Sequence, residues 1–197
     1  EDLNLIIEES NRMSEMVNDI LDYSQLQSGY IRLRPELFDF SGLAESETFH
    51  CAAAATTYGI KIRFEAGPDP VFIHADPLKL SQVLRNLLYN AINHTPEGDV
   101  ITVMLEKKGA VTRLSVKNPG TPISKEDQKI IWERYQRSQH QNGRRMGTGI
   151  GLSIVSTILD AHGMKYGVES DETETVFWLE VTESAPLDSA LMSEAPH

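Results

Sequence analysis

The segment from Asp76 to Pro96 constrains the fold more than any other part of the sequence. Asp76-Pro77 is a strong helix start, because an aspartate side chain can cap free amides and proline fits the first helical position. Thr95-Pro96 ends this helix near His94, since proline cannot continue a helix. A helix with one apolar face must pack against a core. The apolar residues that recur at helical spacing are Leu80, Val83, Leu84, Leu87, Leu88, Ala91 and Ile92.

Asparagines form a second stripe along the same helix. Asn86, Asn90 and Asn93 follow each other at spacings of four and three, so their amides share one side of the helix. Asparagine is an indifferent helix former, which leaves three of them in need of a reason. Amide oxygens suit Mg²⁺, which keeps waters and substrate phosphates as its other ligands. The alternative is a solvated polar face.

The flanking patterns predict an α+β fold, in which a mixed sheet carries helices on one face. Alternating segments indicate strands, and apolar residues at helical spacing indicate helices. The predicted helices besides 77–94 are 41–57 (with Ser41 as N-cap), 124–134 and 148–161; the predicted strands are a hairpin or paired strands within 30–40, then 60–66, 71–74, a hairpin over 100–118, 165–170 and 174–181.

The chain divides into three parts. Residues 1–28 predict one helix with an apolar seam that precedes any globular part, so we expect this seam to pack on partner helices. A helix docked on its own domain is the alternative. We assign residues 1–30 to this helix, 31–183 to one globular domain and 184–197 to a tail that we expect to be disordered. Because the sequence opens inside the helical pattern, we expect it to be part of a longer protein.

Composition excludes several classes of function. The formal net charge is −11 and the sequence pI is near 5.0, which disfavours a nucleic-acid surface. No apolar run approaches the ~20 residues of a membrane span. The single cysteine, Cys51, excludes an internal disulfide framework and fits a reducing compartment.

The sequence GRRMGTGIGLSIV, residues 143–155, is a glycine-rich stretch that opens a helix. Such turns commonly meet a phosphate. Glycines at 147, 149 and 151, preceded by a polar loop over 135–147, do not match the dinucleotide fingerprint, and the Lys-Ser/Thr of a Walker loop is missing. Arg134, Arg137, Arg144 and Arg145 precede the glycines, which suits a polyphosphate. An ordinary basic loop would explain these arginines but not the glycines.

A third candidate motif is VKNPGTPIS, residues 116–124, which links a strand to a helix. Asn118 offers both an acceptor and a donor for a base edge, and Gly120 allows a close approach of the backbone to a ligand. Taken alone, this segment fits an ordinary turn better than a binding site.

Together the motifs resemble the ATP-binding domain of bacterial sensor histidine kinases of two-component systems, in the GHKL superfamily. RNLLYNAINHTP resembles the N box, NPGTPI a variant G1 box, IIWERYQRS the F box and GTGIGLSIV the G2 box. The first helix and DYSQLQSG resemble the second helix of the dimerisation domain. The resemblance implies a two-layer α/β sandwich preceded by one dimerisation helix, with ATP and Mg²⁺ as ligands.

The resemblance also implies roles for individual residues. Asn90 matches the Mg²⁺-binding asparagine, and both Asn86 and Asn90 are expected to be catalytic. Asn86 stands where related ATPases often have an acid that activates water; an amide cannot take that proton, which suits a phosphotransferase better than a hydrolase. Asn118 stands where the family usually has an aspartate that recognises the adenine amino group. The expected nucleotide-binding residues are Asn86, Asn90, Asn93, His94, Asn118, Gly120, Ile123, Tyr135, Arg137, Arg145, Gly147, Thr148, Gly149, Ile150, Gly151 and Leu152.

Three positions depart from the family pattern. Asn93 replaces the usual lysine of the N box and removes a phosphate-facing charge, which Arg144 or Arg145 would have to supply. His94 replaces a frequent tyrosine and can still cover the adenine. Pro122 replaces a glycine and stiffens the turn.

The implied activity is transfer of the ATP γ-phosphoryl group to a histidine on the first dimerisation helix, for relay to a response regulator aspartate. None of the six histidines of this chain has the expected context, so we expect no autophosphorylation of the chain alone. The implied partners are the phosphoacceptor helix, a response regulator receiver domain and a second copy in a homodimer, within the cytoplasmic part of a membrane-anchored sensor. The rival hypotheses are an ATPase of the gyrase or mismatch-repair type and a degenerate nucleotide-binding or scaffolding module.

The two arginines before the glycines give a first prediction. If they supply the charge that Asn93 has removed, Arg144→Ala and Arg145→Ala should each weaken ATP binding by about tenfold, since charge-assisted contacts are strong. Adenosine binding should change little, because adenosine carries no phosphate. Calorimetric titration with both ligands measures the two affinities. Equal losses for both ligands would return the arginines to ordinary surface charges.

Overall fold

Five strands form the main sheet of the computed structural model, which describes residues 32–109, 111–133 and 150–184. Their order is β2-β4-β5-β7-β6; β2 and β4 are parallel and the other neighbours are antiparallel, so the sheet is mixed. A second, two-stranded antiparallel sheet pairs β1 with β3. The strands are β1 (Glu36–Asp39), β2 (Lys61–Glu65), β3 (Phe72–Ala75), β4 (Val100–Lys108), β5 (Val111–Asn118), β6 (Lys165–Ser170) and β7 (Thr175–Thr182).

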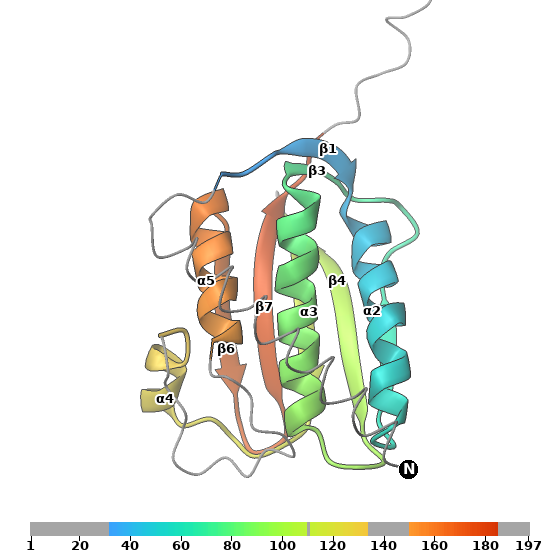
Figure 1. Cartoon of the computed structure of the whole chain (residues 1–197), viewed down its shortest axis with the longest axis vertical. Coiled ribbons are helices and arrows are strands. Elements are labelled where there is room, and N and C mark those ends of the chain that lie inside the picture. Colours follow the sequence, from blue (N-terminus) through green and yellow to red (C-terminus); the bar gives the residue numbers. More distant parts are fainter. Residues whose placement is uncertain (1–31, 110, 134–149, 185–197) are drawn as a thin grey trace, which may run out of the picture.

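Three helices cover one face of the main sheet and form the second layer of the sandwich (Figure 1). The core lies between the two layers, where alternate residues of β4, at 101, 103 and 105, are buried. The predicted α+β sandwich is therefore confirmed. The helices are α2 (Phe40–Thr56), α3 (Pro77–His94) and α5 (Gly151–His162), with the short α4 (Lys125–Ile130) at one end of the sheet.

Helix α3 has the bounds that the sequence predicts. Asp76 Oδ1 accepts a hydrogen bond from the Lys79 amide at 3.1 Å, and Pro77 occupies the first turn. All seven predicted core residues of α3 are buried. Ser81 is buried as well, and its hydroxyl is satisfied because it donates to Glu47 Oε1 of α2. The Arg85 guanidinium lies 3.5 Å from the same oxygen.

The N-cap of α2 corrects the sequence prediction. Asp39, not Ser41, caps the helix, because the Asp39 side chain accepts from the Gly42 amide at 3.1 Å. The Ser41 hydroxyl instead donates to Asp39 and accepts from the Val71 amide at 3.1 Å, which fastens the start of α2 to the segment before β3.

Two other predicted elements differ in extent. The segment 30–40 forms no hairpin in its described part: only Glu36–Asp39 is a strand, and its partner is β3. The predicted helix 124–134 begins after Ser124 as expected but ends at Ile130. The chain turns there because Trp132 packs into the core, with its ring centroid 4.9 Å from that of Tyr166 and 5.6 Å from that of Phe177.

The remaining predictions at the chain ends fall largely on residues that the structure does not describe. The predicted helix over 1–30 lies outside the described residues, and so does the tail from 185 onward. Ser184 is described, and its amide donates to the Phe72 carbonyl at 2.8 Å. Within the described ranges, no helix is both long and apolar enough to cross a membrane.

Candidate functional site

The candidate site lies along the C-terminal half of α3. Asn86, Asn90 and Asn93 are each half-buried on this helix, whose apolar face is fixed against the sheet. Two other elements meet this half of the helix: the first turn of α5 and the turn that follows β5. The structure therefore brings all three predicted sequence motifs, where described, to one helix.

Asn86 faces the start of α5. A Cβ atom added at Gly151 would lie 3.5 Å from Asn86 Oδ1. Asn86 Nδ2 is buried and has no hydrogen-bond partner within the described part of the chain. A buried donor left unpaired is costly, so this amide is a ready donor for an acceptor that enters the site. Ile150, the N-cap of α5, offers no side-chain hydrogen bond, which leaves the first-turn amides of α5 without a side-chain cap.

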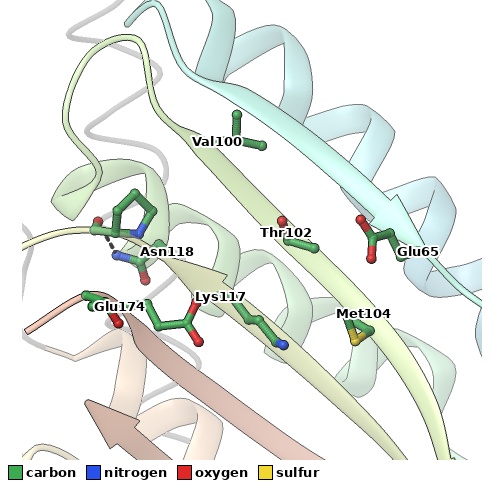
Figure 2. Close-up of a pocket in the computed structure, with 9 residues that line it drawn as sticks. Glu65, Val100, Thr102, Met104, Lys117, Asn118 and Glu174 are labelled. Atoms are coloured by element: carbon green, nitrogen blue, oxygen red, sulfur yellow. Dashed lines mark hydrogen bonds between the residues drawn. The ribbon is translucent and has the colours of Figure 1, made fainter. Parts of the chain in front are cut away.

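Asn118 ends β5 and is 3% exposed. Its Nδ2 donates to the Pro119 carbonyl at 3.0 Å, which leaves Oδ1 as the acceptor for a ligand (Figure 2). The cavity drawn in Figure 2 has a volume of 260 Å³ and lies against β2, β4 and β5. Its lining residues are Glu65, Val100, Thr102, Met104, Lys117, Asn118, Pro119, Thr173 and Glu174.

A larger cavity, of 490 Å³, lies where α3 ends. Its volume falls in the range of ligand pockets, and it contains more of the predicted residues than the cavity of Figure 2, so we take it as the nucleoside end of the site. Its lining residues are Asn93, His94, Thr95, Pro96, Gly120, Thr121, Pro122, Glu172 and Thr173.

Gly120 joins the turn after β5 to the end of α3. Its φ of 156° lies in a region that side chains rarely adopt, and a Cβ there would come within 2.6 Å of the His94 carbonyl oxygen. Only glycine lets these two backbones approach so closely. Burial lowers the pKa of His94, so its ring is neutral at neutral pH and presents an uncharged aromatic surface beside the cavity.

The turn is also held from its far side. Ile123 is buried, and its amide donates to Ser170 Oγ at 2.9 Å; Ser170 in turn contacts Thr175 Oγ1 at 2.7 Å. Leu152, another predicted site residue, is half-buried in the first turn of α5. Neither residue lines either of the two cavities.

Sequence reasoning missed the turn between β6 and β7. Thr173 lines both cavities, and Glu172 lines the larger one. This turn closes on itself through Asp171, whose carboxylate accepts from the Thr173 and Glu174 amides, so in sequence it is an ordinary hairpin turn. Only the pairing of β5 with β7 brings it beside Asn118.

Several predicted site residues cannot be placed, because they lie outside the described residues: Tyr135, Arg137, Arg145, Gly147, Thr148 and Gly149, together with Arg134 and Arg144.

Comparison with known proteins agrees with this geometry. Residues 75–185 match the family described as histidine kinase-, DNA gyrase B-, and HSP90-like ATPase. That match covers α3, the turn after β5 and α5, which are the described elements of the site. The chain belongs to this ATPase family.

Relatives within this ATPase family include sensor kinases. Over 180 residues the chain is 33% identical to the probable sensor kinase SilS of Salmonella typhimurium. The aligned region covers 89% of this chain and 36% of SilS. The chain thus spans about a third of the length of this relative.

Solved structures of histidine kinases share the fold. The structure of full-length ShkA in complex with AMPPNP has a TM-score of 0.77 and 27% identity, over 95% of this chain and 40% of ShkA. ThkA in complex with its response regulator protein TrrA has a TM-score of 0.72 and 28% identity, over 92% of this chain and 50% of ThkA.

The contact between Gly120 and His94 gives a second prediction. Gly120→Ala should destabilise the protein by about 1–3 kcal/mol, because the added methyl group overlaps a backbone oxygen. It should also weaken adenosine binding, since the turn must move away from the end of α3. Thermal melting and adenosine titration measure both effects. Ser46→Ala, a truncation of an exposed residue of α2 that lines neither cavity, is the control and should change neither quantity. An unchanged affinity in Gly120→Ala would place the nucleoside elsewhere.

Proposed function

We propose that this chain is the ATP-binding catalytic part of a sensor histidine kinase. The proposed reaction moves the γ-phosphoryl group of ATP to an imidazole nitrogen of a partner histidine, releases ADP, and is followed by relay to a response regulator aspartate. The observation that carries the proposal is the convergence on α3 of the unpaired Asn86 amide, the start of α5 and the cavity beside His94 and Gly120.

The side chains of the site divide the nucleotide between them. The neutral His94 ring would cover the base in the larger cavity. Asn118, which lines the smaller cavity and lies next to Gly120, would accept from the amino group of the base through Oδ1. Asn86 Nδ2 and the uncapped amides of α5 would donate to phosphate oxygens, as helix N-termini commonly do. Phosphoryl transfer needs chiefly such positioning and charge stabilisation.

The donor set also fits a magnesium ion that arrives with its nucleotide. Among the described residues, no group of three or more His, Cys, Asp or Glu side chains could hold a metal ion. Asn90 would supply a single amide oxygen, and Mg²⁺ typically takes its other ligands from phosphates and water. When bound, the ion would neutralise charge that develops on the phosphates.

Transfer to a protein acceptor is favoured over hydrolysis by the chemistry of Asn86. A hydrolase needs a base to activate water, and an amide cannot accept that proton. Among the described residues, a Cβ atom at Gly151 would meet Oδ1 and Cγ of Asn86 within 4 Å, and neither of these atoms can take a proton from water at neutral pH. The gyrase-type ATPase hypothesis is therefore the weaker one.

The proposed partners follow from the same activity. The relatives are named sensor kinases, and ThkA forms a complex with a response regulator. We propose that this chain acts on a phosphoacceptor helix within a homodimer, that a response regulator receives the phosphoryl group, and that the parent protein is membrane-anchored with this part in the cytoplasm. Asn93, Asn118 and Pro122 keep the degenerate scaffold as the remaining alternative.

Metal-dependent binding tests the proposal through Asn90. Asn90→Ala should weaken Mg²⁺-ATP binding by about tenfold or more, because it removes a ligand oxygen, and should leave binding in EDTA nearly unchanged. Asn90→Asp is the matched control: a carboxylate also supplies a hard oxygen ligand, so the Mg²⁺ dependence should remain. Titration with a fluorescent ATP analogue, with and without Mg²⁺, measures these affinities. No binding to the unaltered chain would favour the scaffold hypothesis.

Labelling separates a kinase from a hydrolase. With γ-labelled ATP, the chain alone should acquire no label and should release phosphate slowly. Addition of a protein that carries the phosphoacceptor helix should give acid-labile label on that partner. Multiple-turnover hydrolysis without any partner would contradict the proposal and favour the ATPase alternative.

A further inference from the structure

The N-terminus of α3, the C-terminus of α5 and the segment before β1 meet at Asp76. The Asp76 amide donates to His162 Nε2 at 3.1 Å, and Asp76 Oδ2 accepts from the Arg34 amide at 2.8 Å. Asp76 Oδ1 caps α3 through the Lys79 amide. Asp76 is 5% exposed, so these hydrogen bonds are largely shielded from water. The buried Asp76 thus contacts Arg34, 42 positions before it, and His162, 86 positions after it.

His162 must be neutral and hold its proton on Nδ1 in this arrangement. Nε2 accepts from the Asp76 amide, so it carries no proton. Nδ1 lies 2.8 Å from the Ile158 carbonyl oxygen, which can only accept, so Nδ1 is the donor. The ring therefore joins the last turn of α5 to the capping residue of α3.

This junction lies at the opposite end of the helix pair from the phosphate end of the site. Helices α3 and α5 run antiparallel, with His162 beside Asp76 and Gly151 beside Asn86 (Figure 1). Asn86 comes ten residues after Asp76, and Gly151 eleven residues before His162, so the helices cover about 15 Å and about 17 Å between the two contacts. The lengths of the two helices between these contacts are therefore similar, so the His162–Asp76 contact and the Gly151–Asn86 contact can form at the same time.

Interdigitated apolar side chains limit how far one helix slides along another, but their contacts carry no directional preference. The inner face of α5 is apolar, with Ile154, Val155, Ile158 and Leu159 buried. A slip by one residue moves a helix by about 1.5 Å, enough to alter the contact between Gly151 and Asn86. A directional hydrogen bond to a buried, doubly anchored aspartate supplies the missing constraint.

We propose that His162 is a positioning residue that sets the axial register of α5 against α3, and thereby the placement of the phosphate-binding end of α5 opposite Asn86. This inference rests on the proposed function for its consequence in binding. The base pocket is built from α3, the turn after β5 and the turn between β6 and β7, without α5. Loss of the junction therefore affects phosphate recognition and spares the nucleoside.

Two substitutions separate this role from ordinary stabilisation. The amide of glutamine reaches the place of His Nε2, so His162→Gln keeps an acceptor for the Asp76 amide. The amide of asparagine reaches only the place of Nδ1, so His162→Asn loses that acceptor. In the full chain, His162→Asn should weaken ATP binding by about threefold to tenfold, the factor that corresponds to one net hydrogen bond, while adenosine binding stays unchanged. His162→Gln should bind both ligands as the unaltered chain does.

Equal losses for ATP and adenosine, or equal losses in both variants, would overturn the positioning role and leave His162 a structural residue. A lower melting temperature with an unchanged ratio of the two affinities would do the same. These outcomes all require that the unaltered chain binds ATP, so they are distinct from failure of the proposed function.

Nuclear magnetic resonance tests the register without nucleotide. Long-range proton–nitrogen spectra of the unaltered chain should show His162 as the neutral Nδ1-protonated tautomer, and the Nε2-protonated form would overturn the inference even if His162→Asn fails to fold. The side-chain amide signals of Asn86 and the backbone amide of Gly151 should shift in His162→Asn and stay in place in His162→Gln. Unshifted signals in His162→Asn would also overturn it.

Discussion

Burial of the apolar face of α3 against the sheet is the constraint on which the rest of this structure depends. Seven apolar residues of this helix are almost fully buried, so the helix cannot rotate about its axis without exposing them. That fixed rotation decides where Asn86, Asn90 and Asn93 lie. It also places the His94 carbonyl under Gly120 and the Asn86 side chain beside Gly151. Both ends of the candidate site are therefore consequences of how one helix packs.

The sequence was most informative where a single local signal decides the structure. Asp76, Pro77 and the periodic apolar residues act within one helix, and α3 has the predicted bounds. Prediction failed where two local signals compete or a distant partner decides. Asp39 and Ser41 are both good N-caps, and the Val71 amide, which occupies Ser41, settles the choice. Trp132 ends α4 early because β6 and β7 offer it aromatic partners, and β1 pairs with a strand more than 30 residues away.

The same distinction applies to the site. The asparagine stripe, Gly120 and Gly151 were predicted from motifs, and the structure brings them to one helix. Thr173 was missed because its proximity to Asn118 arises from strand pairing, which no local pattern encodes. Roles for individual residues stay predictions that the resemblance supplies and the geometry accommodates.

The four asparagines of the site are uncharged, although the formal net charge of the chain is −11 and Glu172 lines the larger cavity. Asn86, Asn90, Asn93 and Asn118 are neutral amides, and burial keeps His94 neutral. A polyphosphate is repelled by acidic surfaces, so neutral donors and acceptors at these positions limit that repulsion. Neutrality has a chemical consequence as well, because none of these amides can remove a proton from water. In the proposed function, amides in place of acids would both limit repulsion of phosphate and leave no base at these positions to activate water.

Because α3 carries both ends of the site, its own helical rise fixes the distance between the base pocket and the phosphate end. The two partner elements are held against it in different ways. The turn after β5 is fastened by the tight Gly120 contact and by the Ile123 amide on Ser170. Helix α5 rests on apolar side chains and on directional contacts: the His162 junction, the Tyr166 hydroxyl on Asp160 and the Ser156 hydroxyl on the Trp132 carbonyl. In the proposed site the nucleoside end is therefore held by tight backbone contacts around Gly120, and the phosphate end by apolar packing together with the polar contacts of α5.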